Sequence, residues 1–195
     1  MKLLYTKRSP YARKVRVVAW EKKIPLELME EDLKNKSSQL LKANPLGKVP
    51  TLILDNGQSL CDSPVICAYL DSLKPKPRLI PQKKNERLKI LHLEAIADGL
   101  LDIIVAAYLE KIRHPDHGNE DFIKAQEETI LRCLKFLETS VKEWEKWTLG
   151  SIAVGCAIGY IHFRMPHLSL PADSRLGKWF AQISNRPSME ATRPQ

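Results

Sequence analysis

Three short segments of the sequence carry residues whose types and spacing could bind a small anionic peptide. Val49 precedes Pro50, and a cis bond between them would turn the main-chain N–H and C=O groups of Val49 outward. An extended peptide can pair with such groups as if it were one more strand. Asp62 and Ser63 begin an apolar helical stretch, where first-turn N–H groups and the Ser63 hydroxyl could hold a carboxylate. Ser9 begins another such stretch.

Each of these residues also has an ordinary structural interpretation. Only about 5–6% of X–Pro bonds in folded proteins are cis, so the segment taken alone favours Pro50 as the trans start of a strand. Ser9, Asp62 and Ser63 are residue types that cap helices, and Pro10 suits the first helical position. The local patterns therefore leave both ligand binding and helix capping open.

An acidic row, Glu94, Asp98 and Asp102, recurs at every fourth position of a long helical stretch. Like charges at this spacing destabilise a helix by a few tenths of a kcal/mol per pair, so we expect another interaction to offset this repulsion. Exposure to water is the default explanation. The alternative is that the row faces basic groups of the first domain or of a symmetry-related subunit.

The cysteines and histidines indicate neither disulfide bonds nor a metal site. The four cysteines show neither CxxC nor metal-ligand spacing, which favours reduced thiols in a cytoplasmic protein. His114 and His117 lie beside Pro115 and Gly118 in a predicted loop, and we expect no metal there. The cysteines are Cys61, Cys67, Cys133 and Cys156.

The length, charge and composition of the chain limit the classes of protein to which it could belong. The chain has 195 residues, enough for one compact domain or two small ones. Of its net charge of +8, residues 1–50 contribute +7, with 12 Lys and Arg against 5 Asp and Glu. Such a basic surface suits an anionic partner or simply solubility. No nucleic-acid motif is present, no apolar run approaches the ~20 residues of a membrane span, and the first residues do not form a signal peptide.

The elements that must position these residues follow from periodicity and turn signals. The first part predicts a βαβ unit and then a ββα unit, the order of a thioredoxin-like domain. The hairpin of the second unit turns at Asp55-Asn56-Gly57 and is expected to be antiparallel. The predicted strands are Lys2–Tyr5, Leu26–Met29, Thr51–Leu54 and Ser59–Cys61, and the helices start at Pro10 and span Ser37–Ala43 and Ser63–Leu73.

The rest of the chain predicts an all-helical bundle after a proline-bearing linker at 74–81. We therefore divide the chain into a thioredoxin-like domain (1–75), a linker (76–84) and a helical domain (85–195). The expected helices are 85–111, one capped by Asn119 and running to about Trp144, a buried helix at 152–163, and 174–184. The tail beyond Arg186 is expected to be irregular.

Three motifs together resemble the glutathione transferase superfamily, in its bacterial, serine-type form. They are S-P-Y-A-R-K-V-R (9–16), N-P-L-G-K-V-P-T-L (44–52) and D-S-P-V-I-C-A-Y-L (62–70), in the family's order and spacing. The resemblance implies that Pro50 is cis and that Val49 binds the cysteinyl main chain of glutathione. It implies that Ser63 holds the γ-glutamyl carboxylate and that Asp62 meets the amino group. The helical domain matches the family only in length and helical character.

The resemblance also assigns a role to the hydroxyl of Ser9, which would donate a hydrogen bond to the glutathione thiolate. Tyr5 is the competing activator, because tyrosine serves in other classes of the family. Lys36 matches the lysine that some classes use for the glycyl carboxylate, although Lys34 could substitute. Asp98 is expected to reach the glutathione amine, and Tyr108 is one candidate wall of the second-substrate pocket.

One position departs from the family pattern. The buried helix of the family usually begins with Ser/Thr-x-x-Asp, whereas the matching positions here are Thr148 and Ser151, so the reciprocal carboxylate of that capping box is missing.

The function that these observations predict is a cytoplasmic, homodimeric glutathione transferase that conjugates glutathione to a small hydrophobic electrophile, as in detoxification. Its partners would be glutathione and that electrophile, with no nucleic acid, membrane or metal. Two alternatives stay open. One is a glutathione-dependent isomerase, dehalogenase or peroxidase on the same scaffold, and the other is a non-catalytic protein that uses the fold to bind protein partners.

Overall fold

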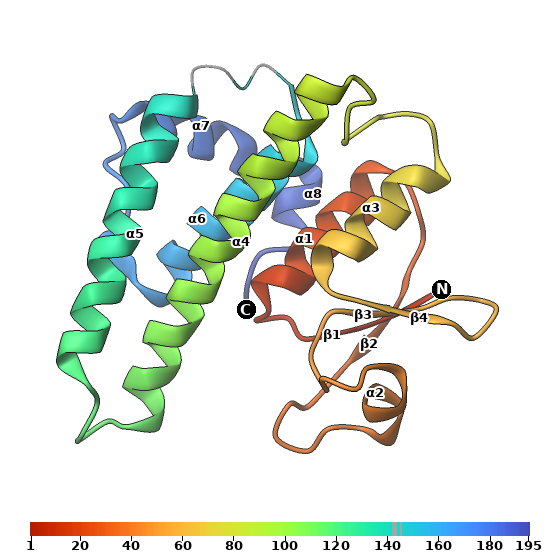
Figure 1. Ribbon diagram of the computed structural model, residues 1–195, viewed down its shortest axis with the longest axis horizontal. Helices are drawn as coiled ribbons and strands as arrows, with labels where there is room; N and C mark the ends of the chain where they lie inside the picture. Colours follow the sequence, from red (N-terminus) through yellow and green to blue (C-terminus); the bar gives the residue numbers. More distant parts are fainter. Residues whose placement is uncertain (142–143, 145) are drawn as a thin grey trace. The chain divides into compact units, whose positions relative to one another are not determined.

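The computed structural model describes residues 1–141, 144 and 146–195, and these form two compact units. Unit 1 comprises residues 1–88 and 187–195, and unit 2 comprises residues 89–186. Figure 1 shows that unit 1 combines a small sheet with helices, whereas unit 2 is helical. The predicted fold class is confirmed.

Unit 1 is built on a four-stranded mixed sheet with strand order β2-β1-β3-β4. β1 (Lys2–Tyr5) is parallel to β2 (Glu27–Glu30) and antiparallel to β3 (Thr51–Ile53). β3 is in turn antiparallel to β4 (Ser59–Cys61), as the hairpin signal predicted. Gly57, in the turn between them, has a φ of +84°, a conformation that glycine adopts without steric cost.

Two helices, α1 (Pro10–Glu21) and α3 (Ser63–Leu73), pack together beside the sheet, and the short α2 (Ser38–Ala43) packs on β3 (Figure 1). α1 and α3 begin where the sequence predicted and α2 begins one residue later, because Ser9, Ser37 and Asp62 accept hydrogen bonds from first-turn N–H groups. The core between helices and sheet consists of fully buried aliphatic side chains. They include Leu3, Leu4, Val15, Val18, Leu52, Ile66 and Leu70.

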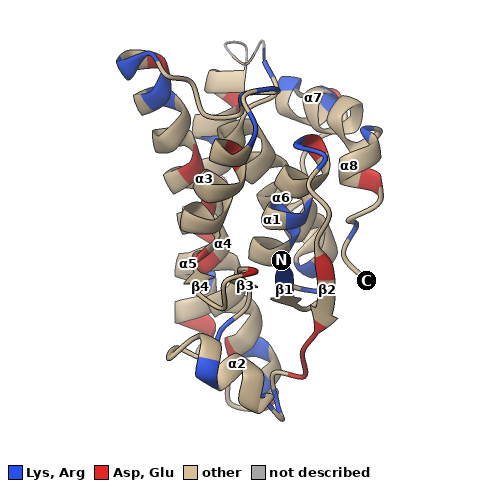
Figure 2. Cartoon of the chain, turned by 90° about the vertical axis from the view of Figure 1, so that its right-hand side faces the viewer, with Lys and Arg blue, Asp and Glu red and all other residues tan. Residues whose placement is uncertain are grey.

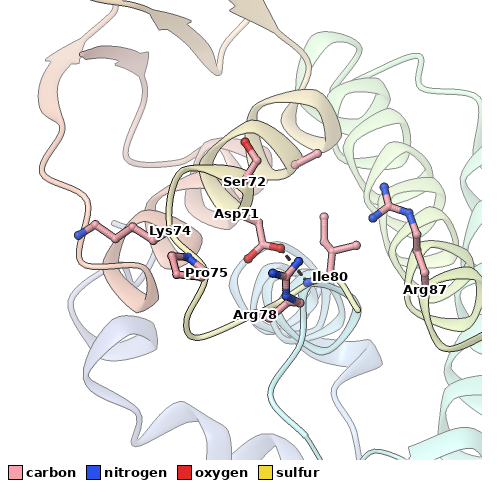
Figure 3. A pocket seen from close by; sticks show the side chains of 8 residues that line it. Asp71, Ser72, Lys74, Pro75, Arg78, Ile80 and Arg87 are labelled. Carbon is pink, nitrogen blue, oxygen red and sulfur yellow. Dashed lines mark hydrogen bonds between the residues drawn. The ribbon is translucent and has the colours of Figure 1, made fainter. Parts of the chain in front are cut away.

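A buried ion pair fastens the ends of α1 and α3 to the chain that follows. The Lys22 ammonium, 1% exposed, lies 2.8 Å from Oδ1 of Asp71 and also donates to the carbonyl oxygens of Lys74 and Pro77. The Ile80 N–H donates to the other Asp71 oxygen at 3.0 Å. Figure 3 shows this bond in the wall of a pocket of about 300 Å³. These hydrogen bonds offset the cost of burying both charges.

The C-terminal segment returns to unit 1 and is not irregular, so the prediction for the tail was wrong. It forms α8 (Pro187–Glu190), which packs on α1. Arg13 is 5% exposed and donates to the Met189 carbonyl at 3.1 Å. The Ser188 hydroxyl donates to the Glu21 carboxylate at 2.6 Å. These contacts make the last residues part of the sheet domain.

Unit 2 contains most of the long helix α4 (Lys84–Arg113), then α5 (Glu120–Ser140), α6 (Leu149–Arg164) and α7 (Arg175–Ser184). A short 3-10 turn, η2 (Pro166–Leu168), follows α6. The predicted extension of α5 to Trp144 runs through residues 142 and 143, which lie outside the described residues. No helix among the described residues has both the length and the hydropathy needed to cross a membrane.

The start of α6 replaces the expected carboxylate with a hydroxyl. The Thr148 N–H donates to Oγ of Ser151 at 2.7 Å, and the Ser151 N–H donates to Oγ1 of Thr148 at 3.4 Å. Both halves of a capping box are therefore present. This cap starts the helix at Leu149, three residues before the predicted start.

Candidate functional site

The register of the sheet brings the predicted binding segments to one edge of unit 1, the side on which β1 and β4 end and β3 begins. Thr51, the first residue of β3, pairs with Leu4 of β1 and with Cys61 of β4. Continuing the antiparallel β3–β4 register past Thr51 places residues 49–50 opposite residues 62–63. β1 ends at the same edge and leads into the start of α1. Residues far apart in the sequence thus converge without a long loop.

The Val49–Pro50 peptide bond is cis, as the resemblance implied. Pro50 is buried and Val49 is half-buried. Neither the N–H nor the C=O of Val49 forms a hydrogen bond with a described residue, although the sheet ladder begins two residues later. Main-chain groups in this state are available to an extended peptide.

The loop that carries Val49 is shaped by two buried side chains that the sequence analysis did not identify. The Asn44 amide donates to the Lys48 carbonyl at 2.9 Å and to Oγ1 of Thr51 at 3.0 Å. Thr51 donates to the same Lys48 carbonyl at 2.9 Å, and both side chains are at most 2% exposed. An asparagine at the start of a Pro- and Gly-containing loop is typical of such side-chain-to-backbone turns, and this signal was available in the sequence.

Lys36 lies along the same loop. A Cβ atom placed on Gly47 would be 3.1 Å from the Lys36 Nζ atom, so the ammonium is close to the loop backbone. The segment around α2 is basic (Figure 2), and Lys34, Lys42 and Lys48 also belong to it. This local charge favours an anionic ligand. The assignment of Lys36, with Lys34 as the alternative, to the glycyl carboxylate of glutathione stays a prediction.

At the start of α3, Asp62 acts as a cap and Ser63 carries a hydroxyl with unused hydrogen-bonding capacity. Asp62 is exposed, has a φ of +70°, and accepts the Ser63 N–H at 2.7 Å. A positive φ is uncommon for a non-glycine residue and often marks a functional site. The Ser63 side chain is fully buried, and its Oγ atom has no hydrogen-bond partner among the described residues. Such an atom is costly unless a ligand satisfies it.

Ser9 combines a capping role with a free donor. Its half-buried side chain accepts the Ala12 N–H at 3.1 Å, while its O–H proton has no acceptor among the described residues. Tyr5, the competing residue, is 7% exposed, and the Arg16 guanidinium lies 5.2 Å from its ring centroid. Burial lowers the pKa of Arg16, and the electrostatic interaction with Tyr5 opposes this effect. Tyr5 is thus packed under a cation, whereas Ser9 can donate to an anion.

The predicted residues of the helical domain belong to unit 2. Asp98 is half-buried in α4, and its role toward glutathione stays a prediction. Within the acidic row, Asp102 is exposed but Glu94 is 4% exposed, so the default expectation of an exposed row was wrong for Glu94. Tyr108 is half-buried and accepts a hydrogen bond from Arg164 at 2.8 Å. The described residues contain no group of three or more His, Cys, Asp or Glu arranged to hold a metal.

Comparison with known proteins identifies the family. A sequence profile described as Glutathione S-transferase, N-terminal domain, matches residues 8–73. The uncharacterized GST-like protein YibF of Escherichia coli (strain K12) is 33% identical over 199 residues, covering 100% of this chain and 98% of that protein. This chain belongs to the glutathione S-transferase superfamily.

Solved structures of glutathione S-transferases match the whole chain. One from Methylobacillus flagellatus KT with glutathione bound has a TM-score of 0.94 and 38% sequence identity, covering 100% of this chain and 99% of that chain. A family member from Pseudomonas fluorescens Pf-5 with bound S-(propanoic acid)-glutathione has a TM-score of 0.89 and 38% identity, with 100% coverage of both chains. The resemblance found in the sequence is confirmed at the level of the superfamily and its fold.

Proposed function

We propose that this glutathione S-transferase superfamily member is an active transferase that binds glutathione at the edge of unit 1 and conjugates it to a small hydrophobic electrophile. The observation that carries this proposal is three unsatisfied groups on two facing segments. They are the main-chain N–H and C=O of Val49 and the buried hydroxyl of Ser63. An extended peptide with a carboxylate at one end matches both.

The residues at this edge fit glutathione part by part. Val49 would pair with the cysteinyl main chain, with the cis Pro50 shaping the loop beside it. Ser63 and the start of α3 would hold the γ-glutamyl carboxylate, where the helix dipole favours a negative charge. Asp62 would meet the amino group, and Lys36 the glycyl carboxylate. Glutathione supplies the nucleophilic thiol when bound.

Ser9 would keep that thiol ionised. A free thiol has a pKa of about 8.5, and lowering it by about 2 units requires roughly 2.7 kcal/mol in favour of the anion. A hydroxyl that donates to a charged sulfur contributes about 1.5–3 kcal/mol. The start of α1 adds roughly 0.3–1 kcal/mol. Together these contributions amount to about 1.8–4 kcal/mol, a range that includes the required value, so Ser9 would need no general base and would not act as a nucleophile.

The relatives support this proposal through what they bind. The Methylobacillus protein holds glutathione, and the Pseudomonas protein holds a conjugate with a propanoic acid group on the sulfur. We extend the proposal to a cytoplasmic homodimer that acts in detoxification. In this proposal, Asp98 also contacts the glutathione amine.

Two measurements test the proposal together: retention on immobilised glutathione and turnover of 1-chloro-2,4-dinitrobenzene. Retention with turnover supports a transferase. Retention without turnover of a panel of electrophiles favours the isomerase, dehalogenase or peroxidase alternative. Loss of both refutes glutathione chemistry and favours a non-catalytic scaffold. The Ser63→Ala variant is the internal check, because it should weaken glutathione retention without altering the fold.

A further inference from the structure

Unit 1 contains a second basic region, a pocket of about 300 Å³ at the end of α3. Its walls come from α3, from the connecting segment 74–83 and from the first turn of α4, all within residues 1–88 of unit 1. Arg78 on the connecting segment and Arg87 on α4 lie on either side of the buried Ile80 in the view of Figure 3. The candidate glutathione site uses the opposite end of α3, so this pocket is separate from it.

The positive charge of the pocket is not balanced by its own carboxylate. Among the described residues that line the pocket, one carries a carboxylate, Asp71, and both of its oxygens are occupied. They accept from the Lys22 ammonium at 2.8 Å and from two main-chain N–H groups of the connecting segment at 2.9 and 3.0 Å. The side chains of Arg78 and Arg87 are exposed and form no hydrogen bond or ion pair with a described residue. Each guanidinium therefore keeps its five N–H donors available.

The main chain that carries Arg78 is held in place from both sides. The two N–H groups that follow Arg78 donate to the buried Asp71 carboxylate. The Pro77 carbonyl just before Arg78 accepts from the Lys22 ammonium at 2.7 Å. Because this main chain is already fixed, a ligand that binds Arg78 orders only the side chain, which lowers the entropic cost of binding.

We propose that this pocket binds a diphosphate group, free or as part of a nucleoside diphosphate, with one phosphoryl group on Arg78 and the other on Arg87. A guanidinium pairs with a phosphoryl group through two parallel N–H bonds. One guanidinium saturates a carboxylate, whereas the linked phosphoryl groups of a diphosphate offer separate oxygens to each arginine. Figure 3 shows the Lys74 ammonium pointing away from both arginines, so Lys74 adds positive charge to the region but no donor to the ligand.

Calorimetric titration of the full-length chain with pyrophosphate, in metal-free buffer, tests this assignment. An ionic strength of about 0.15 M, at which the Debye length is about 8 Å, screens diffuse attraction to the basic surface. We expect one binding site per chain. Arg78→Gln and Arg87→Gln should each raise the Kd about 10-fold, the lower end of the range for a hydrogen bond to a charged group, because both side chains are exposed. Arg78→Lys keeps the charge without the planar fork and should raise the Kd about 3-fold.

Two further variants distinguish the pocket from the rest of the basic surface. Lys89→Gln removes one charge from an exposed position of α4 that does not line the pocket, and it should leave the Kd unchanged. Lys36→Gln removes one charge from the basic segment around α2. If Lys36→Gln weakens pyrophosphate binding and the arginine variants do not, the α2 segment binds the anion and the inference is overturned. The same Kd in the natural protein and in both arginine variants, or no binding at all, also overturns it.

Three other ligands identify the chemical class. ADP that binds at least as tightly as pyrophosphate, and depends on the same arginines, assigns the pocket to the diphosphate of a nucleotide, whereas tighter binding of pyrophosphate assigns it to a free diphosphate. AMP has one phosphoryl group and citrate has only carboxylates, so either one binding as tightly as pyrophosphate overturns the diphosphate assignment. The titrations contain neither glutathione nor an electrophile, and the inference therefore stands or falls independently of the proposed transferase function.

Discussion

Replacing Ser9 by alanine should raise the pKa of glutathione bound to this protein. The Ser9 oxygen accepts the Ala12 N–H at 3.1 Å, so its proton remains available for a thiolate. Alanine removes both interactions. The substitution therefore has a chemical effect on the thiol and a separate structural effect on the start of α1.

The size of each effect follows from these contacts. Loss of a hydrogen bond to a charged sulfur costs about 1.5–3 kcal/mol, which corresponds to a rise of about 1–2 units in the thiol pKa. Loss of the cap costs about 1 kcal/mol of the free energy of unfolding. The second value is measurable by urea denaturation and does not affect the thiol.

The assay is the pH profile of kcat/KM with a chloronitroarene, together with the ultraviolet absorbance of the bound thiolate. In the proposed mechanism Ser9 stabilises the ionised form of the thiol, which would lower the pKa of the bound thiol in the natural protein. The deficit of Ser9→Ala should therefore be largest at low pH, about 10- to 100-fold, and should vanish at a pH above both pKa values.

Two further variants at Ser9 separate the cap from the donor. Ser9→Thr keeps a hydroxyl and should retain the natural pH profile. Ser9→Asp keeps a capping oxygen for Ala12 but has no proton to donate, and its charge opposes a thiolate, so its profile should shift at least as far as that of Ser9→Ala. If all three variants share the natural profile, Ser9 does not activate the thiol.

Three other changes have defined outcomes. Lys22→Met leaves the Asp71 carboxylate buried without its cation and should lower the free energy of unfolding, measured by urea denaturation, by about 3–5 kcal/mol. A loss below about 1 kcal/mol would mean that the ion pair is not buried in solution. Asn44→Ala frees the loop that presents Val49, so the Kd of glutathione should rise about 5- to 10-fold by calorimetry, and an unchanged Kd would refute this positioning role. Ser151→Ala removes half of the α6 cap and should cost about 1 kcal/mol, whereas Ser151→Asp should preserve stability.

The location of the candidate site was predictable because its parts are local in sequence. Ser9 and Asp62 identify helix starts by residue type, and the observed helices begin at the next residues. The hairpin signal at Asp55-Asn56-Gly57 then fixed which strands pair, and the pairing brings the segments together. The cis bond before Pro50 was different: base rates favoured trans, and only the combination of three motifs indicated cis.

Features that depend on distant partners were not predictable in the same way. The burial of Arg13 depends on its hydrogen bond to the Met189 carbonyl, which is 176 residues away in the sequence. The burial of Glu94 and the hydrogen bond from Arg164 to Tyr108 also depend on tertiary packing, which helical periodicity does not encode. Ser151 was noted as a departure from the family, but a hydroxyl can fill the role of the missing carboxylate.

The attachment of the C-terminal segment to α1 has a consequence for biosynthesis. The strands and first helices of unit 1 leave the ribosome early, but the Met189 carbonyl that binds the Arg13 guanidinium is translated 176 residues after Arg13. Domains usually fold in order during synthesis. Unit 1 here stays incomplete until residues 187–195 have been synthesised, so a nascent chain released before residue 187 would present an unfinished α1 surface to chaperones and proteases.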